Sequence, residues 1–198
     1  MFKLIKKSTY NCLESQYNNK CRNVAILEKE LKKQQEFLSN LTRKLIETGA
    51  IIYSISSNKN GTTTYICIID DRDYELKGSL DMFVINSEIE VQKGIGKYRD
   101  MPYLQSYFAS DEVILQELHC DIKDNLYENL GYATMMVDAL KRIAKDSKRF
   151  VISGSLCEDD AESEEKKNRR NNFYIKHGFS VKFDDESCKS GHIKLILK

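Results

Sequence analysis

The stretch ENLGYATMM, from Glu128 to Met136, places a glycine and small residues where a polar loop becomes an apolar helix. A strand, a polar loop and a glycine at a helix start form an anion-binding arrangement. The free N–H groups of a first helical turn point outward, and the helix dipole adds partial positive charge there. Gly131 permits close approach of a ligand, and Ala133 keeps the turn unobstructed. The alternative is that both residues only allow close packing of the helix.

The elements that must position this stretch follow from hydrophobic periodicity and turn signals. Residues 50–56 and 62–70 are β-rich runs separated by an Asn-Gly turn signal, which predicts a hairpin. The other expected elements are a strand or hairpin over 80–92, a strand over 111–122, an amphipathic helix over 131–146, a strand over 149–157, a helix ending at Gly178, and strands over 180–183 and 192–197. No element is assigned to residues 93–110. The central strand–helix–strand order predicts a right-handed crossover with some parallel pairing.

Residues 12–48 are expected to form one long helix that ends at Gly49. Apolar residues follow a spacing of three and four, which is typical of a coiled-coil seam. The seam residues are Val24, Leu27, Leu31, Leu38, Leu41 and Leu45. Polar residues at Gln34 and Thr48 interrupt the seam. The pattern therefore leaves two alternatives open, self-association and packing along the chain's own domain.

A second stretch, FYIKHGF from Phe173 to Phe179, follows the first in the chain. Together the two resemble the GNAT family of N-acetyltransferases. The acetyl-CoA loop of that family, Gln/Arg-x-x-Gly-x-Gly/Ala, is similar to residues 128–133, with Glu128 in place of Gln or Arg. The family's Phe-Tyr-x-x-x-Gly-Phe pattern matches residues 173–179. The resemblance implies an α+β fold over residues 49–198, with a mixed, mostly antiparallel sheet and helices on both faces, preceded by a helical extension over 1–48.

The resemblance also implies roles for particular residues. Backbone N–H groups of the loop would hold the pyrophosphate of acetyl-CoA, the end of the strand before it would pair with the pantetheine arm, and Tyr174 would protonate the departing thiolate. The implied cofactor-binding residues are Cys120, Asp121, Ile122, Leu130, Gly131, Tyr132, Ala133, Thr134 and Asn168. We expect Glu128 to point away from the pyrophosphate or to pair with a cation such as Lys123. A core aromatic with a satisfied hydroxyl is the alternative for Tyr174.

Acetyl transfer to an amine also requires a base, because an amine with a pKa of about 10 is mostly protonated at neutral pH. Strict alternation along residues 113–122 places Leu115, Glu117, His119 and Asp121 on one face of the strand. Glu117 and His119 are therefore candidate catalytic residues. The alternative is that they are hydrated strand residues.

Composition limits the remaining functions. Lys and Arg number 31 and Asp and Glu 30, which gives no reason to expect a nucleic-acid partner. No apolar run is long enough for a membrane span, and the first residues lack the apolar core of a signal peptide. The six cysteines lack zinc-site spacing, which predicts no metal site. Several of them lie within apolar runs, which predicts buried, reduced thiols in a cytoplasmic protein.

These observations predict an acetyl-CoA-dependent N-acetyltransferase that acts on an amine of a small molecule or a protein by direct attack in a ternary complex. A homodimer through the N-terminal helix is expected if that helix self-associates. The alternative is a non-catalytic interaction protein that assembles through this helix and retains a degenerate CoA-binding domain.

Overall fold

A computed structural model of the chain describes residues 7–87, 101–120 and 129–198. Internal contacts divide the chain into two units, Met1–Arg43 and Lys44–Lys198. The expected positions of Asp121, Ile122, Lys123 and Glu128 lie outside the described residues.

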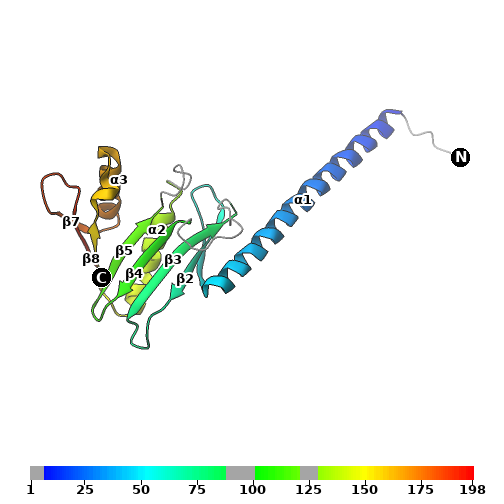
Figure 1. The fold of residues 1–198 in the computed structure, drawn as a ribbon. Helices are drawn as coiled ribbons and strands as arrows, with labels where there is room; N and C mark the ends of the chain where they lie inside the picture. Colours follow the sequence, from blue (N-terminus) through cyan, green and yellow to red (C-terminus); the bar gives the residue numbers. More distant parts are fainter. Residues whose placement is uncertain (1–6, 88–100, 121–128) are drawn as a thin grey trace. The chain divides into compact units, whose positions relative to one another are not determined.

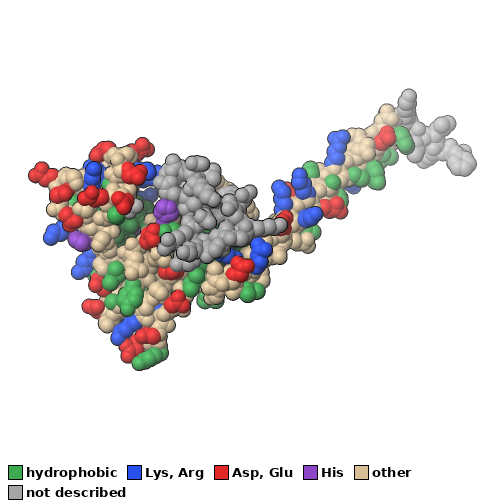
Figure 2. Space-filling view, viewed as in Figure 1, with side chains coloured by type: hydrophobic (Ala, Val, Ile, Leu, Met, Phe, Trp, Pro, Cys, Tyr) green, Lys and Arg blue, Asp and Glu red, His purple; other side chains and the backbone are tan. Residues whose placement is uncertain are grey.

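The first unit consists of most of helix α1, which runs from Lys7 to Thr48. It starts earlier than expected and ends before Gly49, whose φ of 67° is a left-handed conformation that favours glycine at a helix end. Figure 2 shows hydrophobic side chains among charged ones along this helix. The apolar residues of the expected seam that are half or more exposed are Val24, Leu27, Leu31 and Leu38.

The second unit is built on one eight-stranded sheet with the order β1-β2-β3-β4-β5-β6-β8-β7. The strands are β1 (Ile51–Ser57), β2 (Thr63–Asp70), β3 (Gly78–Asn86), β4 (Tyr103–Phe108), β5 (Glu112–His119), β6 (Val151–Leu156), β7 (Ser180–Phe183) and β8 (Gly191–Ile196). All neighbouring pairs are antiparallel except β5 and β6. The predicted α+β class with a mixed, mostly antiparallel sheet is confirmed, as is the hairpin of β1 and β2.

Strand β4 lies in the segment to which the sequence assigned no element. One face of this strand is buried, at Leu104, Ser106 and Phe108, whereas the other face runs from buried Tyr103 to exposed Tyr107. Because a serine lies on the buried face and tyrosines lie on the other, polar and apolar residues do not alternate as they do in an ordinary half-exposed strand. Pro102 directly precedes the strand, a position where the missing N–H is tolerated.

Helix α2 (Tyr132–Asp146) forms the crossover between the parallel strands β5 and β6, as expected. Its buried residues are Tyr132, Met136, Val137, Ala139, Leu140, Ile143 and Ala144. They pack against β3, β4, β5 and β6. Figure 1 shows α2 lying across one face of these strands. Ala133, in the first turn, is only half-buried.

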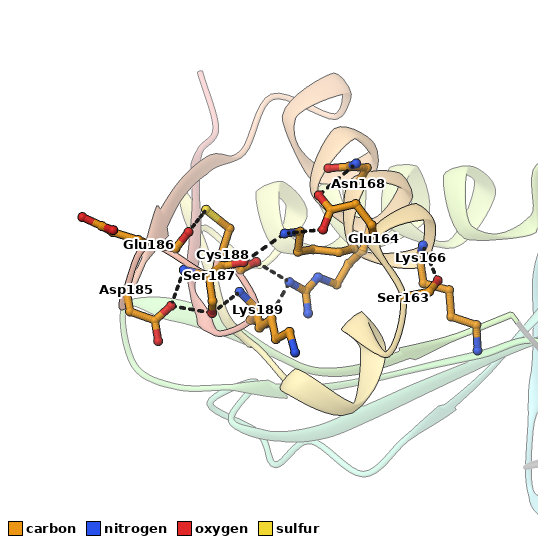
Figure 3. A network of polar contacts seen from close by, with 11 residues as sticks. Ser163, Glu164, Lys166, Asn168, Asp185, Glu186, Ser187, Cys188 and Lys189 are labelled. Carbon is orange, nitrogen blue, oxygen red and sulfur yellow. Dashed lines mark hydrogen bonds and ion pairs between the residues drawn. The ribbon is translucent and has the colours of Figure 1, made fainter.

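The charged stretch after β6 forms two elements where one helix was expected. A 3-10 helix, η2, spans Glu158–Ala161, and helix α3 spans Glu164–Lys176. Ser163 separates them because its extended backbone ends the first turn and its hydroxyl accepts the N–H of Lys166, which caps α3. Figure 3 shows α3 tied to the loop between β7 and β8, where Lys167 donates to the carbonyl of Ser187.

The cysteines differ from the prediction in burial. All six are free thiols, but only Cys67 is buried, whereas Cys12, Cys21 and Cys157 are exposed. Cys12 and Cys21 lie on the mostly polar surface of α1, and Cys157 precedes the charged turn η2. The apolar neighbours that suggested burial therefore predicted the environment only of Cys67, which lies in β2.

Candidate active site

The two parallel strands of the sheet separate part-way along their length. The last pair between β5 and β6 joins Leu115 to Gly154, whereas β5 stays paired with β4 as far as His119. A Cβ atom on Gly154 would lie 2.8 Å from the carbonyl oxygen of Leu115, so only glycine permits this close approach. Beyond it, among the described residues, the β6-facing edge of β5 has no strand partner. An extended ligand can hydrogen bond to such an edge.

A β-bulge lies at the point of separation. Leu115 is opposite Ser106 and Glu117 is opposite Gln105, so Gln116 is an extra residue on β5. Glu117 and His119 lie on one face of β5, because their partners on β4, Gln105 and Tyr103, lie on one face of that strand. The expectation that Leu115 shares that face is wrong, because the bulge shifts the alternation by one residue. Leu115 instead lies on the face of Leu118 and is buried.

The N-terminus of α2 lies beside this edge and is shaped by backbone conformation. Gly131 has a φ of 90°, and Asn129 before it has a φ of 59°. Within the described residues, no side chain caps the helix and the first turn contains no acidic residue. The carbonyl of Gly131 accepts the N–H of Met135 at 3.0 Å, which starts the helical ladder. The N–H groups before Met135 belong to the first turn, where an α-helix offers no acceptor of its own.

These features border a cleft of about 540 Å³ between the end of β5, the start of α2 and the side of α3. The predicted site residues that line it are His119, Cys120, Gly131, Tyr132, Ala133, Thr134 and Tyr174. Tyr174 is 9% exposed, and its ring packs edge-on against the rings of Phe173 and Phe179, with centroids 5.4 and 5.5 Å away. The cleft therefore brings together residues from three segments that are far apart in the sequence.

Three predicted residues do not line the cleft. Leu130 contributes a backbone carbonyl to a hydrogen bond from the N–H of Lys59 at 3.2 Å. Asn168 is exposed on α3 and donates to Glu164 at 3.4 Å, as Figure 3 shows. Glu117 accepts a hydrogen bond from the hydroxyl of Tyr103, the same tyrosine whose ring lies 5.5 Å from that of His119.

Among the residues that the structure describes, more basic than acidic side chains line the cleft. The basic residues that line it are Lys59, Lys166, Arg169, Arg170 and Lys176, and the acidic ones are Asp159 and Glu162. Lys166 forms an ion pair with Glu162 at 3.0 Å. Arg170 donates to the carbonyls of Cys157 and Lys189, the latter at 2.9 Å. This charge distribution suits an anionic ligand, because a desolvated cleft strengthens each attraction.

His177 is a lining residue that the sequence motif contained without assigning it a role. Its Nε2 lies 3.2 Å from the hydroxyl of Thr134, and its Nδ1 lies 3.8 Å from Asp138, so it joins the end of α3 to the first turn of α2. Burial, and then the charge of Lys141, hold the pKa of His177 below its ordinary value, while Asp138 acts in the opposite direction.

Sequence reasoning also missed Lys59, Arg169 and Lys176. Lys59 lies in the turn after β1, and its place beside α2 depends on tertiary packing that no local pattern records. Arg169 lies in a charged stretch whose spacing is that of an ordinary solvated helix face, and Lys176 lies at a variable position of the motif at residues 173–179. The motif at residues 173–179 was the one signal that pointed to their helix.

The structure is similar to solved acetyltransferases. One is the PaiA N-acetyltransferase of Thermoplasma acidophilum in complex with coenzyme A, at 12% identity and a TM-score of 0.42 over 60% of this chain and 61% of that one. The match thus spans less than two thirds of that enzyme's length. Another is the GNAT domain of S. lividans PAT, at 9% identity and a TM-score of 0.48, over 73% and 96% of the two chains. A third is a GNAT family acetyltransferase from Elizabethkingia anophelis with acetyl-CoA bound, at 7% identity and a TM-score of 0.41, over 61% and 77%.

No protein-family model matches the chain, and no curated protein matches it in sequence. In the part of the chain that the structure describes, no three His, Cys, Asp or Glu side chains gather in a way that could hold a metal ion. Across the same residues, no helix is both long and apolar enough to cross a membrane.

Proposed function

We propose that the chain is an acetyl-CoA-dependent N-acetyltransferase of the GNAT type. The observation that carries the proposal is the shared cleft, in which the N-terminus of α2, which has no side-chain cap, and the end of β5 beyond its last pair with β6 form adjoining walls. One wall suits a pyrophosphate and the other suits an extended pantetheine arm, and both belong to a single ligand. The two sequence motifs that resemble the family supply the first wall and Tyr174.

The proposed binding roles follow from the chemistry of each wall. N–H groups of the first turn of α2, at Tyr132, Ala133 and Thr134, donate to the pyrophosphate with the help of the helix dipole. The backbone at the end of β5, around Cys120, pairs with the amide groups of the pantetheine arm as an added strand does. The basic side chains that line the cleft balance the remaining phosphate charge.

The proposed chemistry is direct attack of an amine on the thioester. His119 takes a proton from the acceptor ammonium, and the nitrogen then forms a bond to the acetyl carbonyl carbon. A backbone N–H of β5 stabilises the oxyanion. As the C–S bond breaks, Tyr174 gives its proton to the thiolate, and the second proton that leaves the acylated nitrogen restores the tyrosine hydroxyl. We assign the base to His119 rather than Glu117 because His119 lines the cleft, whereas Glu117 is exposed and engaged by Tyr103.

Calorimetric titration with acetyl-CoA tests the proposal, using Ala133→Asp and its neutral match Ala133→Ser. Ala133 has helical geometry, so an aspartate there adds no backbone strain, unlike a substitution of Gly131 at its φ of 90°. An acidic residue in a first turn also favours the helix dipole, so the variant should stay folded. We expect binding by the wild type and by Ala133→Ser, and a loss of at least about tenfold in Ala133→Asp from repulsion of the pyrophosphate.

No binding to the wild-type chain would overturn the proposed function. Equal binding by both variants would show that the anion is held elsewhere. If binding is established, turnover in the presence of candidate amines defines the acceptor, which we propose to be an amine of a small molecule or of a protein in the cytoplasm.

A second candidate function rests on α1. Four of its six apolar seam residues, Val24, Leu27, Leu31 and Leu38, are half or more exposed, whereas Leu41 is buried. Exposed apolar residues in this spacing are typical of a helix that associates with another helix. The second proposal is therefore an interaction protein that forms a homodimer through α1, with a CoA-binding domain that is not catalytic. Acetyl-CoA binding without turnover on any amine would favour it over the first.

A further inference from the structure

The turn between β1 and β2 places a lysine against the proposed pyrophosphate site. The backbone N–H of Lys59 donates to the carbonyl of Leu130 at 3.2 Å, which joins the turn to the residue before Gly131. The Cγ and Cε atoms of Lys59 lie 3.7 and 3.9 Å from the position that a Cβ atom on Gly131 would occupy. The aliphatic stem thus runs alongside the glycine, and Lys59 lines the same cleft as Ala133 and Thr134.

The turn that carries Lys59 is held by a buried asparagine. Asn58 is 6% exposed, and its Oδ1 accepts the N–H groups of Asn60 and Thr62, both at 2.9 Å. Its Nδ2 donates to the hydroxyl of Tyr132 at 3.1 Å. Because each buried polar group here has a partner, the turn has one defined conformation and not a range of them.

Tyr132 extends this network to the sheet. It is the first residue of α2 and is 1% exposed. Its hydroxyl also accepts a hydrogen bond from Asn86 Nδ2, at the end of β3, at 2.7 Å. The turn after β1, the end of β3 and the start of α2 are therefore fixed to one another by three side chains. Of the three, Asn58 also holds the hairpin turn, whereas Tyr132 and Asn86 lie outside the hairpin of β1 and β2.

We propose that Lys59 is a pyrophosphate-binding residue of the acyl-CoA site, held at the first turn of α2 by the network of Asn58, Tyr132 and Asn86. The inference rests on the proposed function and adds a ligand residue from a segment outside both motifs. Helix N–H groups offer only partial charges, whereas a pyrophosphate is a dianion. A lysine fixed beside the first turn supplies the full positive charge that the helix lacks. Asn58 acts as a positioning residue for Lys59.

The test compares the full chain with Lys59→Ala and with Lys145→Ala, which removes the same charge at the far end of α2. Each is titrated with acetyl-CoA, with acetyl-dephospho-CoA, which lacks only the 3′-phosphate, and with S-acetylpantetheine, which lacks every phosphate. We expect Lys59→Ala to weaken both pyrophosphate-bearing ligands by about tenfold or more and to leave S-acetylpantetheine unchanged. Lys145→Ala should bind all three as the wild type does.

Each contrary result has a separate meaning. Absence of acetyl-CoA binding to the wild type overturns the proposed function itself. If the wild type binds acetyl-CoA and Lys59→Ala binds it equally well, only the proposed role of Lys59 is overturned. A loss confined to acetyl-CoA, with acetyl-dephospho-CoA unaffected, assigns Lys59 to the 3′-phosphate and overturns its assignment to the pyrophosphate.

A double-mutant cycle tests the positioning role of Asn58. Asn58→Ala should weaken acetyl-CoA binding, and adding Lys59→Ala to it should cost little more, because the two residues act through one contact. Additive losses would overturn the positioning role. Thermal unfolding of each variant, recorded without ligand, confirms that binding is measured on folded protein.

Discussion

Tyr174 lines the cleft, and its ring packs edge-on against the rings of Phe173 and Phe179. Tyr174→Phe removes only the hydroxyl and keeps these ring contacts. If Tyr174 protonates the thiolate, kcat should fall by about 10²- to 10⁴-fold, while the affinity for acetyl-CoA measured by calorimetry changes little. An unchanged kcat would make Tyr174 a core aromatic, the alternative that the sequence left open.

His119 and Glu117 share a face of β5, yet only His119 lines the cleft. We therefore expect different effects from isosteric removal of each proton acceptor. His119→Gln should lower kcat by about 10²-fold or more, and Glu117→Gln should lower it less, because Glu117 contacts Tyr103 rather than the cleft. Initial rates at saturating acetyl-CoA compare the two. A larger fall in kcat for Glu117→Gln than for His119→Gln would make Glu117 the base instead of His119.

His177 gives the folded state a predictable dependence on pH. Burial, followed by the charges of Lys141 and Lys176, lowers its pKa in the folded protein below the ordinary 6.5. Protonation therefore favours the unfolded chain. The stability that the neutral imidazole contributes is complete above pH 6.5 and is lost as the pH falls through the folded-state pKa.

Urea unfolding measured from about pH 7 to about pH 5 should show a falling free energy of unfolding in the wild type and a smaller fall in His177→Gln. Asp138, which faces the imidazole, opposes the effect and is retained in both proteins. Parallel curves for the two proteins would contradict this account of the His177 pKa.

At the scale of elements, α1 offers a test of the second candidate function. A heptad seam through Val24, Leu27 and Leu31 should associate with a second copy, and the seam position Leu27 should be sensitive to charge. Light scattering of the full chain is expected to give a dimer, which Leu27→Glu reduces to a monomer. Lys29→Glu, on the opposite side of the helix, should leave the dimer intact. A wild-type monomer at every concentration would remove the proposed homodimer.

At the scale of the whole molecule, the rates at which the cysteines are alkylated can be compared between the two units. Burial raises the pKa of Cys67 in β2 from 9.0 to about 12, and the thiolate is the form that reacts. Cys12 and Cys21 are exposed on α1 in the first unit. Alkylation followed by mass spectrometry should label these two rapidly in the native protein and label Cys67 only as the sheet unfolds. Rapid native labelling of Cys67 would contradict the sheet core described above.

The sequence predicts an element correctly when the residues that specify the element are close together in the chain. The hairpin of β1 and β2 carried its Asn-Gly turn, and α2 carried both periodicity and Gly131, so both were expected correctly. Strand β4 was missed because polar Ser106 lies on its buried face and Tyr107 on its exposed face, so polar and apolar residues do not alternate. The bulge at Gln116 was missed because a bulge is defined by the partner strand.

The same distinction applies to the candidate site. Gly131 and Tyr174 line the cleft and were predicted, because each belongs to a motif that is contiguous in the chain. Lys59 was not found, because its place depends on hydrogen bonds from Asn58 and from its own N–H to segments far along the chain. Asn168 was carried over from the resemblance as an asparagine that precedes Tyr174, outside both motifs, and the structure turns it toward Glu164 instead.

Gly154 lets β6 approach Leu115 closely at the last rung before the parallel strands separate, although it does not line the cleft. Any larger residue at position 154 would shift the point at which β5 and β6 separate. It would thereby change the length of the β5 edge that is open to a ligand. A library randomised at this position and selected for acetyl transfer should therefore return glycine almost alone. Gly154 would then be required for activity because it sets the length of the open β5 edge, although it makes no contact with the ligand.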